Sequence, residues 1–364
     1  MSLYMKLHNQ LSWLYLQGHV MYRKRHRRRL CTSDLAKKQG HLTPLDDTQR
    51  DEITGFWQPF RKVEEEMRWF EFYNSFCTDK QQLKYYIPDN IMYLDIDLML
   101  TDPTRSHQLD DKNLYDLYFK GAKLPRTIVR KCNGVILDGD YQPLTLGQAL
   151  DLCHKETQII KKPSRNSQGG KGIKIMNLSA TTDDELSQQL KEPSDYIIQE
   201  VLSQHESINS IYDQSINTVR IMSLLMDDTI YLLSSVLRMG RDGSRVDNAS
   251  KGGIVCGIND DGTLKEFAYN TKGDRWSQHP QGPVFKGLKI AGYDKCCALV
   301  KSLAGRFCTT SKLISWDLAI DKDGEPVIIE VNLSFGEVDF HQMCNGPVFG
   351  DLTEHVLSTV YKHK

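Results

Sequence analysis

The spacing of hydrophobic residues predicts helices in the first part of the chain and short strands further on. Apolar residues recur at three- and four-residue steps over residues 3–22 and again from about residue 51 to residue 76, which is typical of amphipathic helices. From about residue 110, β-branched runs alternate with turns rich in Gly, Asn and Asp. Strands are predicted at Thr127–Arg130, Thr157–Lys161, Ile173–Met176, Tyr196–Gln199, Thr218–Leu225 and Ile230–Val236. Helices are predicted near Lys112–Phe119, Leu146–Cys153 and Asp183–Leu190.

This alternation of strands, helices and hairpin turns predicts a fold of the α+β class. The length of 364 residues is more than one hydrophobic core usually accommodates, so two or three packed subdomains are expected. With 40% hydrophobic and 26% charged residues, the composition is that of a globular protein and excludes a fibrous or mostly disordered chain.

The net charge of −1 conceals an uneven distribution along the chain. Residues 1–30 contain seven of the 46 Lys and Arg residues and no Asp or Glu, so the remainder, with 39 basic and 47 acidic residues, has a net charge of −8. An amphipathic helix followed by a basic stretch fits peripheral contact with an anionic membrane. The alternative is a helix that packs on the acidic body and pairs its arginines there. No nucleic-acid partner is expected, because the basic cluster is short, lacks interleaved aromatic residues and is joined to an acidic body.

The nine cysteines point to free thiols, because their number is odd and no pair has the CxxC spacing of a zinc or redox site. No apolar run approaches the roughly 20 residues that a membrane span needs. The basic residues near the start follow the apolar residues, which is unlike a secretory signal. These features predict a cytoplasmic protein, with peripheral attachment to the inner membrane face as a further option.

A loop rich in glycine and basic residues follows one of the predicted strands. The strand ends in Lys161, Lys162 and Pro163, and the loop continues through residues 164–172 into a second strand. Glycines allow backbone amides to approach a ligand closely and to form a concave site for phosphates. Because this loop joins strand to strand, Walker A and Rossmann loops, which open a helix, are disfavoured. A flexible surface hairpin is the alternative interpretation.

Two apolar strands near the C-terminus, joined by a tight turn, carry a pair of carboxylates. Pairing Ile320 with Val327 places Asp317 directly opposite Glu330, and Asn332 shares their face because side chains two apart on a strand point the same way. Two carboxylates and an amide oxygen make an oxygen-only site that suits Mg²⁺ held together with nucleotide phosphates. A polar strand face exposed to water is the alternative, but the flanking apolar runs indicate burial.

The order of these motifs resembles that of the ATP-grasp ligases. A lysine-ended strand, a glycine hairpin, a strand that leads into Gln199-Glu200-Val201-Leu202, and a late hairpin with Asp…Glu-x-Asn follow one another. The chain is most similar to the sugar-transfer-associated ATP-grasp group found with polysaccharide-biosynthesis genes. Stretches that resemble this narrower group are Asn217-Thr218-x-Arg220, Asp247-Asn248-x-x-x-Gly252-Gly253 and Ser315-Trp316-Asp317.

The resemblance covers about residues 85–350 and implies an ATP-grasp fold, in which two α+β subdomains enclose ATP, together with a helical N-terminal region. It implies ATP and two Mg²⁺ ions as cofactors. The implied domains are a helical region with a basic arm at 1–84, the N-terminal and lid subdomains at 85–202, and the C-terminal subdomain with the metal site at 203–364.

The resemblance also assigns the nucleotide site by position in the motifs. It implies two phosphate-binding lysines, lid glycines, a segment that holds adenine and an acid that binds ribose. These nucleotide-binding residues are Lys112, Lys162, Gly169, Gly170, Gly172, Gln199, Glu200, Leu202 and Glu206, and the implied magnesium ligands are Asp317, Glu330 and Asn332.

One position departs from relatives of the D-alanine ligase type, which have an arginine two residues before the first metal aspartate. Here that residue is Ser315. Charge stabilisation of the reacting carboxylate is therefore expected from Arg220 or Arg238, with Lys162 as the catalytic lysine on the phosphate side. For each arginine an ordinary ion pair is the alternative. The histidines expected to be structural are His205, His279 and His341.

These features predict an ATP- and Mg²⁺-dependent carboxylate–amine ligase that acts through an acyl phosphate. By analogy with the group, the expected substrates are an amino acid and a sugar or uronic acid of a surface polysaccharide. An ATP-grasp phosphotransferase is the nearest alternative, and a non-catalytic membrane- or polyanion-binding protein is the second. The joint presence of both lysines and all three metal ligands argues against a degenerate site.

Overall fold

The computed structural model describes residues 21, 24–102, 105–106, 109–165, 170–333 and 336–361. The chain forms two compact units, Met1–Met99 with Gly346–Lys364, and Leu100–Asn345. The helix predicted over residues 3–22 lies outside the described residues, apart from residue 21. None of the described helices is long and apolar enough to cross a membrane.

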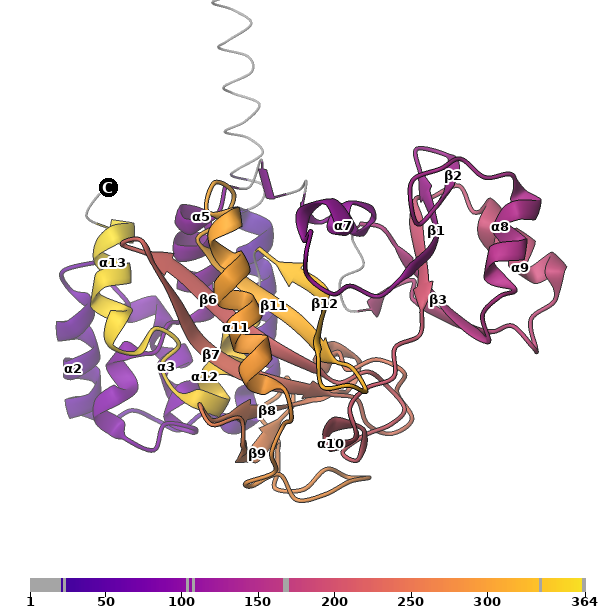
Figure 1. The fold of residues 1–364 in the computed structure, drawn as a ribbon. Coiled ribbons are helices and arrows are strands. Elements are labelled where there is room, and N and C mark those ends of the chain that lie inside the picture. The colour runs from indigo at the N-terminus through magenta and orange to yellow at the C-terminus, as the bar shows by residue number, and fades with distance from the viewer. Residues whose placement is uncertain are drawn as a thin grey trace, which may run out of the picture. The chain divides into compact units, whose positions relative to one another are not determined.

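The first unit is helical in its described residues. Helical residues 24–37 precede α2 (Asp47–Trp57), α3 (Met67–Asn74), α4 (Asp89–Ile91) and α13 (Thr353–Tyr361), as Figure 1 shows. Short 3₁₀ or π segments lie at η1 (Gln39–His41), η2 (Glu64–Glu66), η3 (Lys80–Tyr85), η4 (Met92–Ile96) and η9 (Gly350–Leu352). Fully buried aromatic rings, among them Trp57, Phe70 and Phe72, form its core.

The continuous helix predicted from residue 51 to residue 76 is wrong. The helix α2 ends at Trp57, and α3 starts only at Met67. Pro59 follows the end of α2 by two residues and cannot continue a helix, because it has no backbone N–H. The apolar spacing predicted one helix because Val63, in the stretch between α2 and α3, is also a buried apolar residue although it is not helical.

In the second unit, a five-stranded antiparallel sheet carries two helices on one face. Its strand order is β2-β1-β5-β3-β4, and α8 (Leu146–Cys153) and α9 (Asp183–Lys191) cover it, each begun by a capping box. The predicted strands and helices of this region are confirmed, with small differences at their ends. The strands are β1 (Thr127–Cys132), β2 (Val135–Asp138), β3 (Gln158–Pro163), β4 (Lys174–Asn177) and β5 (Tyr196–Glu200).

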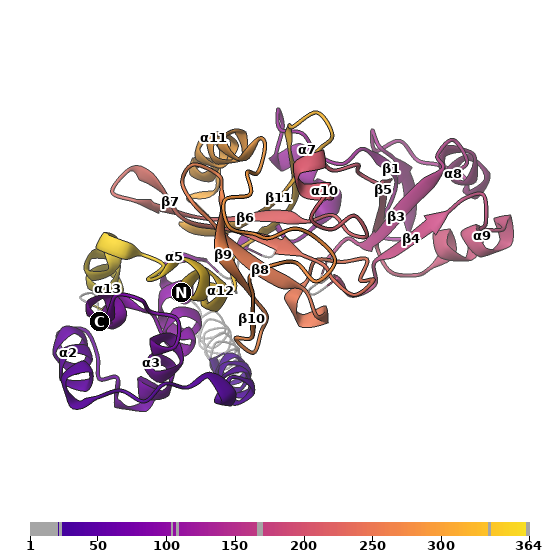
Figure 2. The same ribbon diagram turned by 90° about the horizontal axis from the view of Figure 1, so that it is seen from below.

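A seven-stranded antiparallel sheet forms the rest of this unit, in the order β10-β9-β8-β7-β6-β11-β12. The helices α11 (Tyr293–Ala304) and α12 (Val338–Asn345) lie on opposite faces of it, as Figure 2 shows. The strands are β6 (Thr218–Met226), β7 (Thr229–Met239), β8 (Ile254–Ile258), β9 (Leu264–Tyr269), β10 (Arg275–Trp276), β11 (Leu313–Ile320) and β12 (Pro326–Asn332). The remaining short helices of this unit are η5 (Lys112–Leu114), α7 (Tyr115–Tyr118), α10 (Glu206–Asn209), η7 (Ala249–Lys251) and η8 (Gly305–Phe307), while α5 (Asp97–Leu100) belongs to the first unit except for its last residue.

Alternation along β11 separates a hydrophobic face from a polar one. Ile314, Trp316 and Leu318 belong to the apolar core that also includes residues of α11. The residues between them, Ser315 and Asp317, therefore point to the other face, which is the face that α12 partly covers. The polar side chains of the candidate site are gathered on this second face.

The predicted pairing of Asp317 with Glu330 is confirmed, but the register at the turn is wrong by one residue. Ile320 pairs with Pro326 instead of Val327. A β-bulge between Asp317 and Leu318 then restores the predicted register from Asp317 onward, because it adds one residue to β12.

Candidate active site

Asp317 is the centre of a buried cluster of charges on the polar face of the large sheet. It lies opposite Arg220 of β6. Its two carboxylate oxygens each accept a hydrogen bond from Arg220 at 2.7 Å, and Oδ2 also accepts from Arg238 Nη1 at 3.0 Å. Although burial raises the pKa of Asp317, the positive charges of Arg220 and Arg238 outweigh it, so the pKa is lowered. The carboxylate is therefore held ionised.

The three predicted magnesium ligands lie on this same face. Glu330 is opposite Asp317, and Asn332 Nδ2 donates to Asp317 Oδ2 at 3.2 Å. Glu330 in turn accepts from Lys112 Nζ at 2.6 Å. Among the described residues, no group of three His, Cys, Asp or Glu side chains could hold a metal ion, and the predicted set has two carboxylates and one amide. Its oxygen donors fit Mg²⁺ in kind, but the arginines already engage both oxygens of Asp317.

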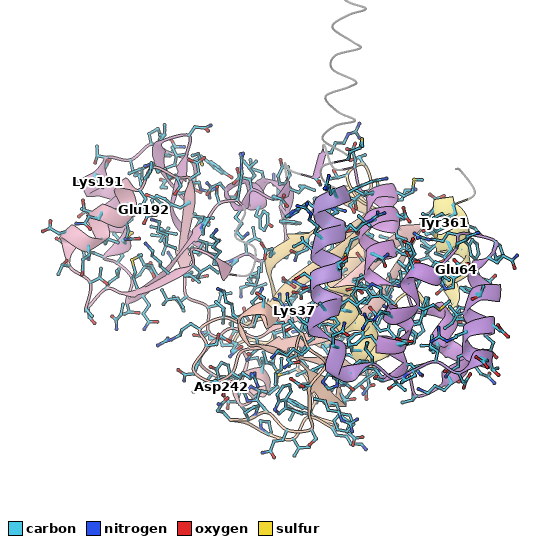
Figure 3. All side chains as sticks on the ribbon, turned by 180° about the vertical axis from the view of Figure 1, so that it is seen from behind. Lys37, Glu64, Lys191, Glu192, Asp242 and Tyr361 are labelled. Atoms are coloured by element: carbon cyan, nitrogen blue, oxygen red, sulfur yellow. The ribbon has the colours of Figure 1, made fainter. Side chains whose placement is uncertain are left out.

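The two lysines at the end of β3 point to opposite faces of the small sheet. Lys161 donates to Glu192 at 2.6 Å, at the end of α9 (Figure 3), so its charge is balanced on the helix-covered face. Lys162 lies on the other face, buried, with Gln199 Oε1 at 3.3 Å from its Nζ. Burial, and then the positive charge of Lys112, lower the pKa of Lys162 to about 8. An anion is the ligand that would stabilise this lysine in its charged form.

Lys112 is placed close to the phosphate loop by its backbone. Asp111 caps the short helix η5 that begins at Lys112, and the Lys112 amide donates to Ser164 O at 2.8 Å. Asp111 also accepts from Arg165 at 2.7 Å. These bonds hold the start of the loop against η5, so that both predicted phosphate-binding lysines belong to one neighbourhood.

The loop between β3 and β4 is a strand-to-strand hairpin, as predicted. Gly170 and Gly172 have φ of +70° and +78°, a conformation that L side chains rarely adopt. A Cβ at Gly172 would lie 2.8 Å from Pro163 Cγ, so the close approach also requires glycine there. Gly169 lies outside the described residues, and its assignment stays a prediction.

The segment predicted to hold adenine and ribose begins with the last two residues of β5 and continues beyond the strand. Gln199 donates to Pro125 O at 3.2 Å, and Glu200 accepts from the Arg126 amide at 2.9 Å. Leu202 is half-buried, and Glu206 is exposed at the first position of α10. A cleft of about 540 Å³ is lined by Lys112 and Gln199, together with Leu124–Ile128. The other described members of the predicted nucleotide set do not line this cleft, namely Lys162, Gly170, Gly172, Glu200, Leu202 and Glu206. The structure thus brings only part of the predicted nucleotide set to one cleft.

Glu337 belongs to the cluster, although the sequence motifs did not single it out. Its Oε2 accepts from Arg220 Nη1 at 2.5 Å and lies 3.8 Å from Arg238 Nε. The signal that could have found it is a second acidic residue five positions after Asn332, next to a glycine. The arginines expected to stabilise a reacting carboxylate are thus bound to two carboxylates of the protein itself.

Of the histidines expected to be structural, His279 is buried and bonds Gly240 O at 2.9 Å. His205 caps α10 by accepting from the Ser207 amide at 3.1 Å. His341 lies on α12 with Nδ1 2.8 Å from Ser234 Oγ, while its Nε2 is buried and has no hydrogen-bond partner among the described residues.

Comparison with known proteins supplies a family and a general fold. The family model described as sugar-transfer associated ATP-grasp matches residues 97–358. Solved structures that resemble the chain include D-alanyl-alanine synthetase A from Vibrio cholerae O1 biovar eltor (12% identity, TM-score 0.42, 72% of this chain and 67% of that one). An L-amino acid ligase from Bacillus licheniformis is similar at 13% identity, with TM-score 0.41 and coverage of 70% and 48%. The D-cycloserine synthetase DcsG is similar at 14% identity, with TM-score 0.41 and coverage of 73% of each chain. No curated protein sequence matches.

Proposed function

The chain belongs to the sugar-transfer associated ATP-grasp family, and from this premise we propose that it is an ATP- and Mg²⁺-dependent carboxylate–amine ligase. The predicted ATP-grasp fold and α+β class agree with that membership. The observation that carries the proposal is Lys162, a buried lysine beside a second lysine, Lys112. The lowered pKa of Lys162 indicates a position suited to bind an anion.

The proposed reaction begins with activation of a carboxylate, which is a poor acyl donor until its oxygen is phosphorylated. Lys112 and Lys162 bind phosphate oxygens of ATP, and the loop at residues 164–172 excludes water from the acyl phosphate. Arg220 and Arg238 stabilise negative charge on the reacting carboxylate. An amine then attacks the acyl carbon, which gives an amide and releases phosphate, with ADP as the other product.

Glu330, Asn332 and Asp317 are the residues proposed to hold magnesium, with two ions as the expected number. Bound Mg²⁺ supplies positive charge that neutralises the phosphate oxygens. Glu330 is the best placed of the three, because its side chain is 32% exposed and pairs only with Lys112 among the described salt bridges. Asp317 can join only if it gives up part of its bonding to the arginines.

The proposed substrates are an amino acid and a sugar or uronic acid in surface-polysaccharide biosynthesis, in keeping with the description of the family. The test is incubation with ATP, Mg²⁺ and a panel of amino acids and uronic acids, with hydroxylamine as a substitute amine. Carboxylate-dependent ADP release with a hydroxamate or amide product supports the ligase. A phosphorylated product that resists hydroxylamine would show a phosphotransferase instead, and no ADP release with any pair would contradict both.

A matched pair of variants separates site chemistry from general damage. Lys162→Ala should abolish ADP release, because it removes the buried phosphate-binding charge. Lys191→Ala removes an exposed lysine at the end of α9 (Figure 3) and should leave the rate unchanged. Persistent ADP release in Lys162→Ala would contradict the assignment of the nucleotide site.

The ligase is proposed to act in the cytoplasm, where ATP is available and where the nine free cysteines remain reduced. Peripheral membrane contact is proposed for residues 1–30, of which the described residues 24–30 belong to a helix that runs to residue 37, called here the basic helix. Arg27 of this helix is buried and donates to Tyr93 O at 2.7 Å, so that arginine has a packing role. Among the described residues of this stretch, the arginines available to an anionic lipid surface are the exposed Arg25, Arg28 and Arg29.

Sedimentation with vesicles that contain anionic lipid tests the membrane contact without disturbing the packing of Arg27. Replacing the three exposed arginines with Gln should release the protein from the vesicles, and added salt should do the same. The control replaces three exposed lysines elsewhere, Lys286, Lys301 and Lys322, with Gln. Equal binding of both triple variants would show that the basic helix has no specific role.

A further inference from the structure

The two carboxylates that bind Arg220 differ in their surroundings. Asp317 belongs to a central strand and its side chain is 2% exposed, whereas the side chain of Glu337, in the segment before α12, is 29% exposed. Asp317 makes two bonds to Arg220, while Glu337 makes one. Glu337 is therefore the member of this cluster that faces solvent and can move without disturbing the sheet.

The cluster contains hydrogen-bond donors that Glu337 does not satisfy. Arg238 Nε lies 3.8 Å from Glu337 Oε2, which is too far for a hydrogen bond, and it is buried with no partner among the described residues. His341 Nε2 is likewise buried with no partner in the part of the chain that the structure describes. Buried donors are normally satisfied, so two such atoms near one anion position indicate a missing acceptor.

Ser234 Oγ is the hydrogen-bond partner of His341. Asn345 Nδ2 donates to Ser234 Oγ at 2.8 Å, and His341 Nδ1 also lies 2.8 Å from this oxygen, where the tautomer of the ring decides which atom donates. Burial, and then the charge of Arg220, lower the pKa of His341 to about 3, so the ring is neutral. In the tautomer that accepts from the Ser234 hydroxyl at Nδ1, the single proton of the ring lies on Nε2, and Nε2 is then a donor.

Neighbouring positions on the sheet place His341 and Glu337 over the same polar face. Ser315, Met222 and Ser234 pair in a row across β11, β6 and β7. His341 bonds Ser234 at one end of this row, and Gly336 packs on Ser315 at the other end. A Cβ added at Gly336 would lie 2.2 Å from Ser315 Oγ. Glu337 follows with φ of +58°, a conformation unusual for a residue other than glycine.

We propose that Glu337 is a resident carboxylate that occupies the binding position of the substrate carboxylate between Arg220 and Arg238, and that the substrate replaces it there with His341 as a third donor. This inference rests on the proposed ligase function. A carboxylate that is not attached to the backbone can accept from Arg220 Nη1 and Arg238 Nε together, which Glu337 does not do. Glu337 thereby excludes ligands that do not bring a carboxylate of their own.

Acetate is the probe, because it is the smallest carboxylate that carries a carbon substituent. Thermal unfolding of the full chain is followed in sodium acetate and in sodium chloride at equal ionic strength, without ATP. Glu337→Gln should bind acetate with an apparent Kd about tenfold lower than the wild-type protein. The matched control is Glu266→Gln, which removes an exposed carboxylate of the same unit and should behave as wild type.

Two further variants keep the test decisive. Adding His341→Phe to Glu337→Gln should remove most of the gain in acetate affinity, because the ring is kept without its donor. Should Glu337→Gln fail to fold, Glu337→Asp retains the charge on a shorter side chain and should shift the acetate affinity in the same direction. Equal acetate affinity in wild type, Glu266→Gln and the Glu337 variants would overturn the proposal, and a preference for phosphate over acetate would overturn the carboxylate class.

The acetate titration needs neither ATP nor turnover, so it tests this proposal separately from the ligase function. Where the hydroxamate assay finds a productive carboxylate, Glu337→Gln should lower its KM and leave the KM for ATP unchanged. An unchanged KM for that carboxylate would overturn the role of Glu337 while the ligase function stands. Absence of any hydroxamate would contradict the ligase function, and the acetate affinities would then decide by themselves whether Glu337 occupies a carboxylate site.

Discussion

Lys162 allows a sharp test of the nucleotide site, because its protonation changes near neutral pH. Burial, together with Lys112, lowers its pKa from 10.5 to about 8, which means that the charged form is disfavoured by about 3 kcal/mol relative to a solvent-exposed lysine. Phosphate oxygens bind only the charged form. For a pKa of 8, the charged fraction falls about tenfold between pH 7 and pH 9, so the apparent Kd for ATP should rise about tenfold over that interval.

The assay is calorimetric titration with a non-hydrolysable ATP analogue at constant Mg²⁺, in buffers that differ in their ionisation enthalpy. At pH 8, binding should take up about half a proton per nucleotide, because the bound phosphate draws Lys162 into its charged form. The variant Lys162→Arg should bind without this uptake, because a guanidinium stays charged throughout. Lys191→Arg is the control and should match wild type.

The contribution of Lys162 to folding stability should increase with pH, whereas its contribution to nucleotide affinity should decrease. The pKa of Lys162 in the nucleotide-free folded protein lies below its unfolded value of 10.5, so the unfolded chain binds more protons between about pH 8 and pH 10.5. The contribution of this group to stability therefore rises with pH over that window. Equal nucleotide affinity at pH 7 and pH 9 in wild type, with no proton uptake, would refute the reasoning for both effects.

Three substitutions test other parts of the site. Asp317→Asn should lower the free energy of unfolding in urea by about 3–5 kcal/mol, because it removes the buried counter-charge of two arginines; a loss below about 1 kcal/mol would contradict that role. Glu330→Gln should raise the Mg²⁺ concentration for half-maximal ADP release at least about tenfold, and an unchanged titration would remove Glu330 from the metal site. Gly336→Ala should lower the free energy of unfolding by about 1–3 kcal/mol in the same urea assay, because a Cβ at Gly336 would lie 2.2 Å from the Ser315 hydroxyl. Adding Ser315→Gly should restore the lost stability. A double variant as unstable as Gly336→Ala would refute the contact.

Much of the second unit could be predicted from local patterns. The helices α8 and α9 begin with capping boxes at Thr145 and Thr182. The strands of the same unit show either alternating polar and apolar residues or continuous apolar runs, as buried strands do. The pairing of Asp317 with Glu330 also follows from two strands joined by a short turn. The bulge in β12 could not be predicted, because its extra residue depends on how this edge strand pairs with β11, and no local pattern marks it.

Apart from Glu337, the residues of the charge cluster could be named from the sequence, but their mutual bonding could not. Arg220 and Arg238 are 97 and 79 residues away from Asp317 along the chain, and nothing in a local pattern states which strands lie side by side. Pairing of β11 with β6, and of β6 with β7, brings them together. The role of Glu337 depends on a backbone approach of the preceding glycine, which has no sequence signature of its own.

The serine at position 315 connects these observations. Relatives of the D-alanine ligase type have an arginine two residues before the metal aspartate, and such a side chain could not coexist with Gly336 packed on Ser315 Oγ. A small residue at position 315 therefore allows the segment before α12 to approach β11, so that Glu337 can accept a hydrogen bond from Arg220. The positive charge that β11 lacks is supplied by Arg220 and Arg238 of the neighbouring strands. An arginine restored at position 315 should then displace Glu337 rather than add to the cluster, because both require the same space.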